Sequence, residues 1–283
     1  NRVGLPGEQL LPLLLQALDH DGDRVRHEAM NGLLSLRPDS RAAVPHLVGR
    51  LASDDPVKRG QAINLLGRIG PDAGDAVPRL ITQLGQAAAE ERVACRQAMV
   101  DIGQAAVPWI LASAKSQPLA MLGGKSWQAS CLGEIGLQAT PALAAALKAQ
   151  QADGSVYLAL LGLKNIAAKS AAARQAILPF LEHKQAAFRS MALSALVAST
   201  AKPASLMPRL QAAMRDDNTL VRQEAMDALA SLGRSARGAT SALVESLDDR
   251  DAAVQLSAVR AIGKLGSEDR KSTRLNSSHT SIS

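Results

Sequence analysis

A ten-residue segment recurs along this chain at intervals of about 33 residues. It reads AAVPHLVGRL at 42–51, DAVPRLITQL at 75–84 and AAVPWILASA at 105–114. The prolines of the series are 33, 33, 30, 33, 38 and 29 residues apart, and they are Pro12, Pro45, Pro78, Pro108, Pro141, Pro179 and Pro208. An eighth segment, GATSALVESL, keeps the pattern with Ala242 in place of proline. Self-similarity at a fixed period of this length indicates a repeat architecture.

Each proline segment is followed by a turn and by a second stretch with the apolar period of a helix. In LVRQEAMDALASLG the apolar residues make one stripe on an α-helix, at Val221, Ala225, Leu229 and Leu232. The runs DHDGD, SDDP and RDDN supply turn formers and N-cap side chains between the two helices. Proline is expected in the first turn of each first helix. Glycine is expected to end the second helices, at Gly70, Gly103, Gly136, Gly233 and Gly266.

These signals predict an all-α fold made of helical hairpins, and we count eight of them between Gly7 and Gly266. One hairpin cannot bury both faces of its helices, so the hairpins are expected to stack into a right-handed α-solenoid whose second helices line the inner surface. Aromatic residues make up only 2% of the chain, so alanine and leucine must fill the core. The predicted solenoid domain covers residues 1–267.

The pattern resembles the HEAT-repeat family, especially the short bacterial repeats also called phycobilisome-lyase-like. The resemblance is carried by the D…VR…A…L…LG second helices and by the AVP openings at Val44, Val77 and Val107. It covers nearly all of residues 7–267 and implies the solenoid fold. It implies little about activity, because packing residues define the family. The family name alone implies one possible function, that of an accessory subunit of a chromophore lyase.

The end of the chain, DRKSTRLNSSHTSIS, lacks this apolar period. The peptide at 269–279 can be encoded by DNA that looks like a widely used short-read sequencing adapter read in one frame. We therefore predict that residues 268–283 are a non-native, disordered tail that contributes to no functional site. Since the chain also begins without Met, we expect residues 1–267 to be a fragment of a longer protein with uncapped terminal repeats.

Charge, cysteine content and hydropathy narrow the class of protein. The net charge of +6 falls to +4 without residues 269–283, which leaves 29 basic and 25 acidic residues and compels no nucleic-acid partner. Cys95 and Cys131 lie inside apolar helical patterns and are expected to be reduced core residues rather than a disulfide framework. No apolar run is long enough to cross a bilayer, no signal peptide is visible, and a cytoplasmic location is favoured.

A cation recurs near the start of the second helix in six of the eight units, as Arg26, Arg59, Arg92, Lys125, Arg189 and Arg222. Leu158 and Gln255 stand at the remaining two places. Acids precede several of these positions, namely Asp21, Asp54, Glu90 and Asp217. One interpretation is a structural ladder, in which each arginine bonds an aspartate and carbonyls of a neighbouring unit; the resemblance to HEAT-like proteins favours it. The other is a basic stripe for phosphates or an acidic partner.

Two motifs resemble binding sites of other proteins but lack essential residues. The pair His27-Glu28 resembles the His-Glu pairs with which deoxyhypusine hydroxylase, a HEAT-like enzyme, holds iron. One pair cannot build a di-metal site, so we expect no metal site and an exposed His27. The sequence GGKS at 123–126 resembles a phosphate-binding loop, but Leu119 stands where that motif needs glycine. A loose turn that opens a helix is expected there instead.

Two tryptophans are candidates for stacking on a nucleic-acid base. HEAT-like alkylpurine DNA glycosylases use aromatic and acidic residues in a basic concave face, and Trp109 and Trp127 could serve in this way. Five aromatic residues in the whole chain give thin support for that mechanism. We expect a core or rim position for Trp109. Serine, histidine and aspartate show no nucleophile-elbow or triad signature, so no catalytic residue is predicted.

The sequence favours a non-enzymatic scaffold that binds a protein partner along its concave second-helix surface and needs no cofactor. Its specificity is expected to come from exposed second-helix residues, namely Arg26, Arg59, Gln97, Lys125, Arg189, Arg222 and Gln255. The alternatives are a nucleic-acid-binding HEAT-like protein, with or without base-excision activity, and the accessory subunit of a chromophore lyase. The protein is expected to be a monomer or to associate end to end through its uncapped repeats.

Overall fold

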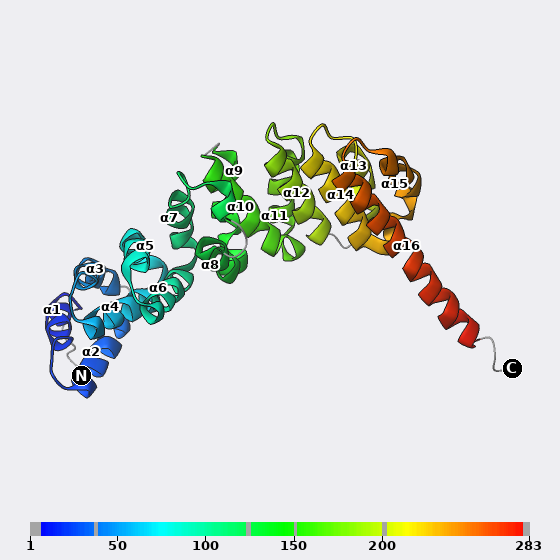
Figure 1. Ribbon diagram of the computed structural model, residues 1–283. Helices are drawn as coiled ribbons and strands as arrows, with labels where there is room; N and C mark the ends of the chain where they lie inside the picture. The colour runs from blue at the N-terminus through cyan, green and yellow to red at the C-terminus, as the bar shows by residue number, and fades with distance from the viewer. Residues whose placement is uncertain (1–6, 37–38, 123–125, 150–151, 200–202, 280–283) are drawn as a thin grey trace. The chain divides into compact units, whose positions relative to one another are not determined.

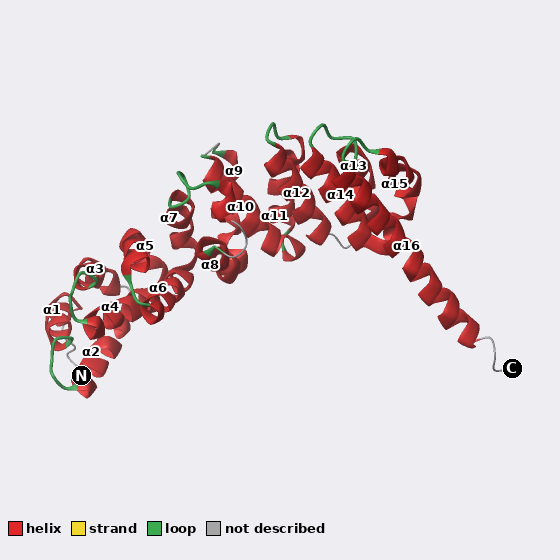
Figure 2. Cartoon of the chain, viewed as in Figure 1, coloured by secondary structure: helices red, strands yellow, loops and turns green. Residues whose placement is uncertain are grey.

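The computed structural model describes residues 7–36, 39–122, 126–149, 152–199 and 203–279. In these ranges every regular element is a helix (Figure 2). The α-helices pair into eight hairpins, as predicted, and short 3₁₀ helices (η) connect them. The chain is therefore an all-α solenoid, whose right-handedness stays a prediction. It divides into two compact units, which are residues 1–159 (unit 1) and residues 160–283 (unit 2).

In unit 1 each hairpin consists of a first helix and a second helix. The first helices are α1 (Gly7–Ala17), α3 (Val44–Arg50), α5 (Val77–Gln86), α7 (Val107–Ala112) and α9 (Thr140–Lys148). The second helices are α2 (Asp23–Ser35), α4 (Pro56–Ile69), α6 (Ala89–Ile102), α8 (Trp127–Ile135) and α10 (Asp153–Ile166), which contains the boundary between the units. The connectors are η1 (Asp39–Ala43), η2 (Gly70–Ala76), η3 (Gly103–Ala106), η4 (Leu119–Leu122) and η5 (Gly136–Ala139). Figure 1 shows α2, α4 and α6 as neighbours in one row.

Unit 2 repeats this organisation. Its first helices are α11 (Ala171–Ile177), α13 (Met207–Ala213) and α15 (Thr240–Glu245). Its second helices are α12 (Ala186–Ser199), α14 (Thr219–Leu232) and α16 (Ala252–His279), and α14 packs against both α12 and α16 (Figure 1). The connectors are η6 (Ala167–Lys169), η7 (Leu178–Glu182), η8 (Pro203–Leu206), η9 (Gly233–Ala239) and η10 (Ser246–Asp248).

The predicted punctuation explains where most helices begin and end. Four of the five predicted glycine caps directly follow a second helix and have φ between 53° and 78°, where a side chain would be strained; they are Gly70, Gly103, Gly136 and Gly233. At the other end of these helices, Asp55 accepts the backbone N–H of Val57 at 2.8 Å, and Asn218 accepts that of Leu220 at 2.9 Å. Proline lies in the first turn of α3, α5, α7, α9 and α13.

The core is built from small and branched aliphatic side chains, as the low aromatic content predicts. The predicted stripe of α14 is buried at Val221, Ala225 and Leu229. Both cysteines are free and buried, which confirms their assignment to the core. Burial raises the pKa of each thiol to about 12, so neither is a nucleophile at neutral pH. Where α4 crosses α6, a Cβ on Gly67 would lie 3.0 Å from the Cα of Ala98, so glycine permits this close contact.

Three predictions about helix ends are wrong. Pro12 lies inside α1 rather than in its first turn, because α1 begins at Gly7. Pro179 follows α11 and is the second residue of η7, in the hairpin where the proline spacing lengthens to 38 residues. Gly266 does not end its helix, since α16 continues to His279. At the other four glycines a proline- or threonine-initiated first helix packs back onto the hairpin, whereas the sequence after Gly266 holds no such segment to turn the chain.

Residues 268–279 are also helical, although the sequence predicts an irregular tail there (Figure 1). The segment SEDRKSTRLNSSH contains no proline and only one apolar residue, so it can continue the helix of α16 without an apolar face of its own. The side chains from Gly266 onward lie outside the described ones. The adapter origin of this segment and the boundary at residue 267 stay predictions.

Candidate functional site

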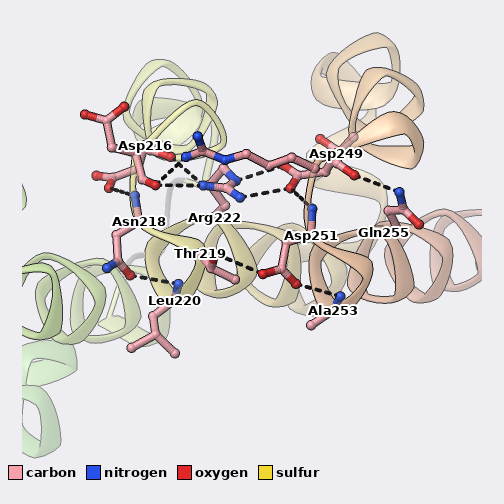
Figure 3. A network of polar contacts seen from close by, with 12 residues as sticks. Asp216, Asn218, Thr219, Leu220, Arg222, Asp249, Asp251, Ala253 and Gln255 are labelled. Atoms are coloured by element: carbon pink, nitrogen blue, oxygen red, sulfur yellow. Dashed lines mark hydrogen bonds and ion pairs between the residues drawn. The ribbon is translucent and has the colours of Figure 1, made fainter.

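The recurring arginines of the second helices are built into the contacts between hairpins. In α14, Arg222 donates from Nη1 to the carbonyl oxygens of Asp216 and Asp217, at 2.9 and 3.1 Å. Its Nε and Nη2 donate hydrogen bonds to the two carboxylate oxygens of Asp249, in the loop of the next hairpin, at 2.8 and 2.9 Å (Figure 3). Only a planar guanidinium offers its donors in this fixed fork, so Arg222 joins two hairpins with both ends of its head group.

The same geometry occurs at two other hairpins. Arg189 places its fork on Asp216 at 2.8 and 2.6 Å, and Arg59 places its fork on Glu91 at 3.0 Å for both bonds. Each also donates from Nη1 to the carbonyls five and six positions before it. We call these three pairs, Arg59–Glu91, Arg189–Asp216 and Arg222–Asp249, the arginine ladder. Each pair fastens one hairpin to the next within its own unit.

The carboxylates of the ladder are held in their charged form. The hydrogen bonds from Arg222 lower the pKa of Asp249 below its usual value, although burial opposes this. The bonds from Arg59 lower the pKa of Glu91 in the same way. At Asp216 burial is the largest influence and disfavours the charge, but the hydrogen bonds from Arg189 and the Asn218 N–H outweigh it, so this pKa is also lowered.

The remaining positions of the series show what happens when a ladder partner is missing. Arg26 still donates to the carbonyls of its own loop, but it pairs with Asp23 of its own helix and its buried Nε has no partner. Arg92 is exposed, and within the described part of the chain its side chain makes no hydrogen bond or ion pair. Gln255 keeps one bond, from Nε2 to the Asp249 carbonyl at 2.7 Å. Lys125 lies outside the described residues.

The structure therefore supports the ladder interpretation of the repeated cations and corrects two details of it. The accepting carbonyls belong to the arginine's own hairpin, and only the carboxylate comes from the neighbouring one. The sequence pattern did not identify the three carboxylates. It pointed to Glu90 and Asp217, which are adjacent to Glu91 and Asp216, and to no acid beside Asp249. The constant offset of 27 residues from Arg189 to Asp216 and from Arg222 to Asp249 is a signal that could have found them.

The expectation that these arginines are exposed is wrong. Their side chains are between 4% and 21% exposed, at Arg26, Arg59, Arg189 and Arg222. Gln97 differs from them because it is exposed and lies five positions beyond the ladder place in its helix. A direct role of the arginines in partner binding stays a prediction, but other residues form the more exposed surface of these helices.

That surface is formed by residues one and five positions after the ladder place. In unit 1 these are His27 and Asn31 on α2, Gly60 and Asn64 on α4, and Val93 and Gln97 on α6, and all six are exposed. We call these six residues the second-helix ridge. Because α2, α4 and α6 lie side by side in one row, the ridge runs across three consecutive hairpins (Figure 1).

A groove of about 780 Å³ lies between α2 and α4 along this ridge. It is lined by Asp23, Arg26, His27 and Met30 of α2 and by Gly60, Gln61, Asn64 and Arg68 of α4. Gly60 helps to keep the groove open, since a Cβ built there would meet no atom within 4 Å. Met30 is nearly buried in this groove, and the other lining side chains are an aspartate, two arginines, two amides and an imidazole.

The second helices α10, α12 and α14 share a polar cluster. Lys164 of α10 donates from Nζ to Oγ of Ser194 on α12 at 2.6 Å. Glu224 of α14 accepts a hydrogen bond from the same serine. Burial raises the pKa of the Glu224 carboxyl above its usual value, and the bond from Ser194 and the charge of Lys164 offset this in part. These contacts link α10, α12 and α14.

The other motifs have ordinary structural positions. His27 is exposed, as predicted, and no group of three metal-ligating side chains exists in the described ranges. Ser126 caps α8 by accepting the N–H of Ala129, so the described end of the GGKS motif opens a helix, while residues 123–125 lie outside the described residues. Trp109 is 42% exposed on α7, which is the predicted rim position. None of the helices in the described segments has the length and apolar character that a membrane span requires.

Residues 206–273 match the family model for HEAT repeats. This segment contains HEAT repeats. The matched segment comprises most of the last two hairpins, and the 33-residue period carries the same hairpin design through the preceding ones. The narrower resemblance to phycobilisome-lyase-like repeats stays a prediction. No curated protein has a sequence that matches this chain.

Three solved structures illustrate what this chain is similar to. Human deoxyhypusine hydroxylase in complex with glycerol is 21% identical over 92% of this chain and 97% of that one, with a TM-score of 0.38. A HEAT-like repeats protein from the archaeon Thermococcus onnurineus is 15% identical over 93% and 98%, with a TM-score of 0.34. The karyopherin Kap121p, bound to the extreme C-terminus of the phosphatase Cdc14p, is 12% identical over 91% and 34%, with a TM-score of 0.46.

Proposed function

We propose that this HEAT-repeat chain is a non-enzymatic scaffold that binds a protein partner through the second-helix ridge of unit 1. The observation that carries the proposal is the composition of that ridge. Three consecutive second helices present an imidazole, amides and a valine at equivalent exposed places, beside a groove. Such a surface matches the mixed polar and apolar surface of a protein.

The ladder supports this choice over nucleic-acid binding. Affinity for a nucleic acid comes largely from cations that neutralise phosphates. Here Arg59, Arg189 and Arg222 already share their forks with carboxylates and are mostly buried. To bind phosphate they would have to break ion pairs that fasten neighbouring hairpins. A basic stripe along the second helices therefore lacks most of the free charge that it would need.

A photo-crosslinking amino acid placed at a ridge position tests the proposal. The probe replaces Asn64 of α4, which is exposed beside the groove. A matched control places the same probe at His46, which is exposed on α3, the first helix of the same hairpin. The full chain carrying either probe is irradiated in an extract of the source cells, and the adducts are separated by mass.

We expect a discrete protein adduct from position 64 and none of that mass from position 46. Equal labelling from both positions would show that the ridge is not the contact surface. A nuclease-sensitive adduct at position 64 would replace the proposal with nucleic-acid binding. A chain that shows no adduct at either position, at several probe lengths, would remove the scaffold function itself.

A further inference from the structure

The middle of the ridge is a column of side-chain amides. Asn31, Asn64 and Gln97 are 33 residues apart and occupy the same place on α2, α4 and α6. All three are exposed. Within the described part of the chain, the amides of Asn31 and Asn64 make no hydrogen bond. Gln97 donates one N–H to Asp101 at 2.9 Å and keeps a second N–H and its carbonyl oxygen.

The chemistry of this column matches a peptide backbone. A primary amide carries two N–H donors and a carbonyl acceptor, so it can donate to a backbone C=O or accept from a backbone N–H. The column has no net charge, and neither has a peptide backbone, so it offers no preference for a phosphate or for a charged side chain. Main-chain hydrogen bonds of this kind give affinity with little dependence on the partner's sequence.

The spacing of the column selects one backbone conformation. Packed helices lie roughly 8–10 Å apart, which sets the interval between amides on consecutive hairpins. In a polyproline II segment, carbonyls that point the same way recur every three residues, or about 9.3 Å at a rise of 3.1 Å per residue. In a β-strand, groups on one edge recur every two residues, or about 6.6 Å, and therefore lose register after one hairpin. Polyproline II also leaves its carbonyls free to accept hydrogen bonds.

The groove beside the column provides space for a side chain of such a segment. Its opening at Gly60 has no side chain, and its floor is Met30, an adaptable apolar residue that is 8% exposed. On the next hairpin the equivalent of Gly60 is Val93, which is 56% exposed and offers a second apolar contact. A proline ring or a short aliphatic side chain can contact Met30 and Val93, while Asp23, Arg26 and Arg68 line the rest of the groove.

We propose that the partner is recognised through an extended polyproline II segment, which crosses α2, α4 and α6 with its carbonyls on the amides of Asn31, Asn64 and Gln97 and one side chain in the groove. This proposal rests on the proposed function, since it specifies which part of a protein partner the ridge binds. It predicts a three-residue period in the ligand, one triplet for each hairpin.

The test uses the full chain and two phage-displayed peptide libraries, (Pro-Xaa-Xaa) repeated four times and (Gly-Xaa-Xaa) repeated four times. Selected peptides are then synthesised, and their dissociation constants are measured by fluorescence anisotropy. The double variant Asn31→Ala/Asn64→Ala removes two amides of the column. The matched control Gln16→Ala/Gln86→Ala removes two exposed amides from the first helices α1 and α5. Alanine raises helix propensity at exposed helical sites, so both variants are expected to fold.

We expect binders from the proline library alone. Two lost hydrogen bonds of about 1 kcal/mol each correspond to roughly a thirtyfold weaker binding by the ridge variant, with no change in the control. Asn64→Asp, which keeps the acceptors but loses the donors, should bind as weakly as Asn64→Ala. Equal selection from both libraries, or equal losses in the ridge and control variants, would overturn the proposal.

The outcome also separates this inference from the function on which it rests. If neither library yields binders while the probe at position 64 still captures a protein, then the scaffold function stands and recognition of a polyproline II segment is wrong. If the probe captures nothing and the libraries fail, both proposals are wrong.

Discussion

In the arginine ladder, a single arginine side chain stabilises the contact between two neighbouring hairpins. Arg222 is 3% exposed, and replacing it with methionine would remove both fork donors from the Asp249 carboxylate, which would keep the Asp251 N–H, and one donor from each of two loop carbonyls. Removing one partner of a buried ion pair costs about 3–5 kcal/mol because a charge is left uncompensated. We expect Arg222→Met to lower the free energy of unfolding by about 3 kcal/mol in urea titrations followed by circular dichroism.

Arg26 supplies the matched control for this measurement. It occupies the equivalent place, but among the described residues its ion pair is with the exposed Asp23 of its own helix, and it forms no fork on another hairpin there. Arg26→Met should therefore lower the free energy of unfolding by only about 1 kcal/mol. Equal losses in the two variants would mean that the fork between hairpins contributes nothing beyond the bonds to the loop.

The ladder also predicts how stability depends on pH. The pKa of Asp249 is lower in the folded chain than its ordinary value of about 4, because Arg222 stabilises the charged form. This contribution is present above the ordinary value and is lost as the pH falls through the folded pKa. We expect the free energy of unfolding to decline steadily below about pH 4 and the decline to be shallower in Asp249→Asn.

Asp248→Asn is the control for the pH experiment, since it removes the same charge from an exposed side chain of the same loop. Its pH profile should follow that of the unchanged protein. A profile of Asp249→Asn that is as steep as the control's would show that the fork does not couple protonation to folding.

Residue-scale geometry explains why the predicted arginines are largely buried while the residues beside them are exposed. Adjacent residues on a helix are rotated by about 100°, so a position one residue away faces a different direction. Arg59 points back to its own loop, while Gly60 beside it opens onto the groove. Sequence periodicity located the correct helices and the correct turn of each helix. It could not show that the long arginine side chain folds back instead of facing outward.

At the scale of elements, the glycine that ends a second helix is required by its backbone angle. Gly136 has φ +66° and ψ −138°, and a Cβ there would meet no atom within 4 Å, so any loss in Gly136→Ala reports backbone strain alone. Such a conformation costs an alanine about 1–3 kcal/mol. Gly60 is equally open but lies inside α4, so Gly60→Ala should stabilise the chain by about 0.5–1 kcal/mol. Urea titration of both variants tests this, because the free energy of unfolding should fall in Gly136→Ala and rise in Gly60→Ala.

Local signals predicted the elements better than they predicted the contacts between them. Proline at the start of α5 and glycine after α6 are each read from a few neighbouring residues, and both were placed correctly. Gly266 has the same local signal, yet its helix continues, because ending it also needs a following helix that packs back. The carboxylates of the ladder were missed for a related reason. Their partners lie 27 or 32 residues away, and only the stacking of hairpins brings them together.

At the scale of the whole molecule, each hairpin covers apolar residues of the one before it. In the seventh hairpin Met214 and Met226 are 6% and 0% exposed. The equivalent residues of the eighth hairpin, Leu247 and Val259, are 37% and 55% exposed. The same places thus change from buried to exposed when no further hairpin covers them. Two neighbouring aliphatic side chains on this end face favour association with another apolar surface.

We therefore expect the chain to self-associate through the end face of the eighth hairpin. Sedimentation velocity should show a weight-average mass that rises with protein concentration. In Leu247→Lys/Val259→Lys, association should be at least about tenfold weaker, since even 1.4 kcal/mol of lost apolar burial has that effect. Leu220→Lys, a change at a side chain that is 58% exposed on α14, should leave association unchanged. A chain that is monomeric at every concentration, or a double variant that associates as the unchanged chain does, would show that this apolar end face is not an interface.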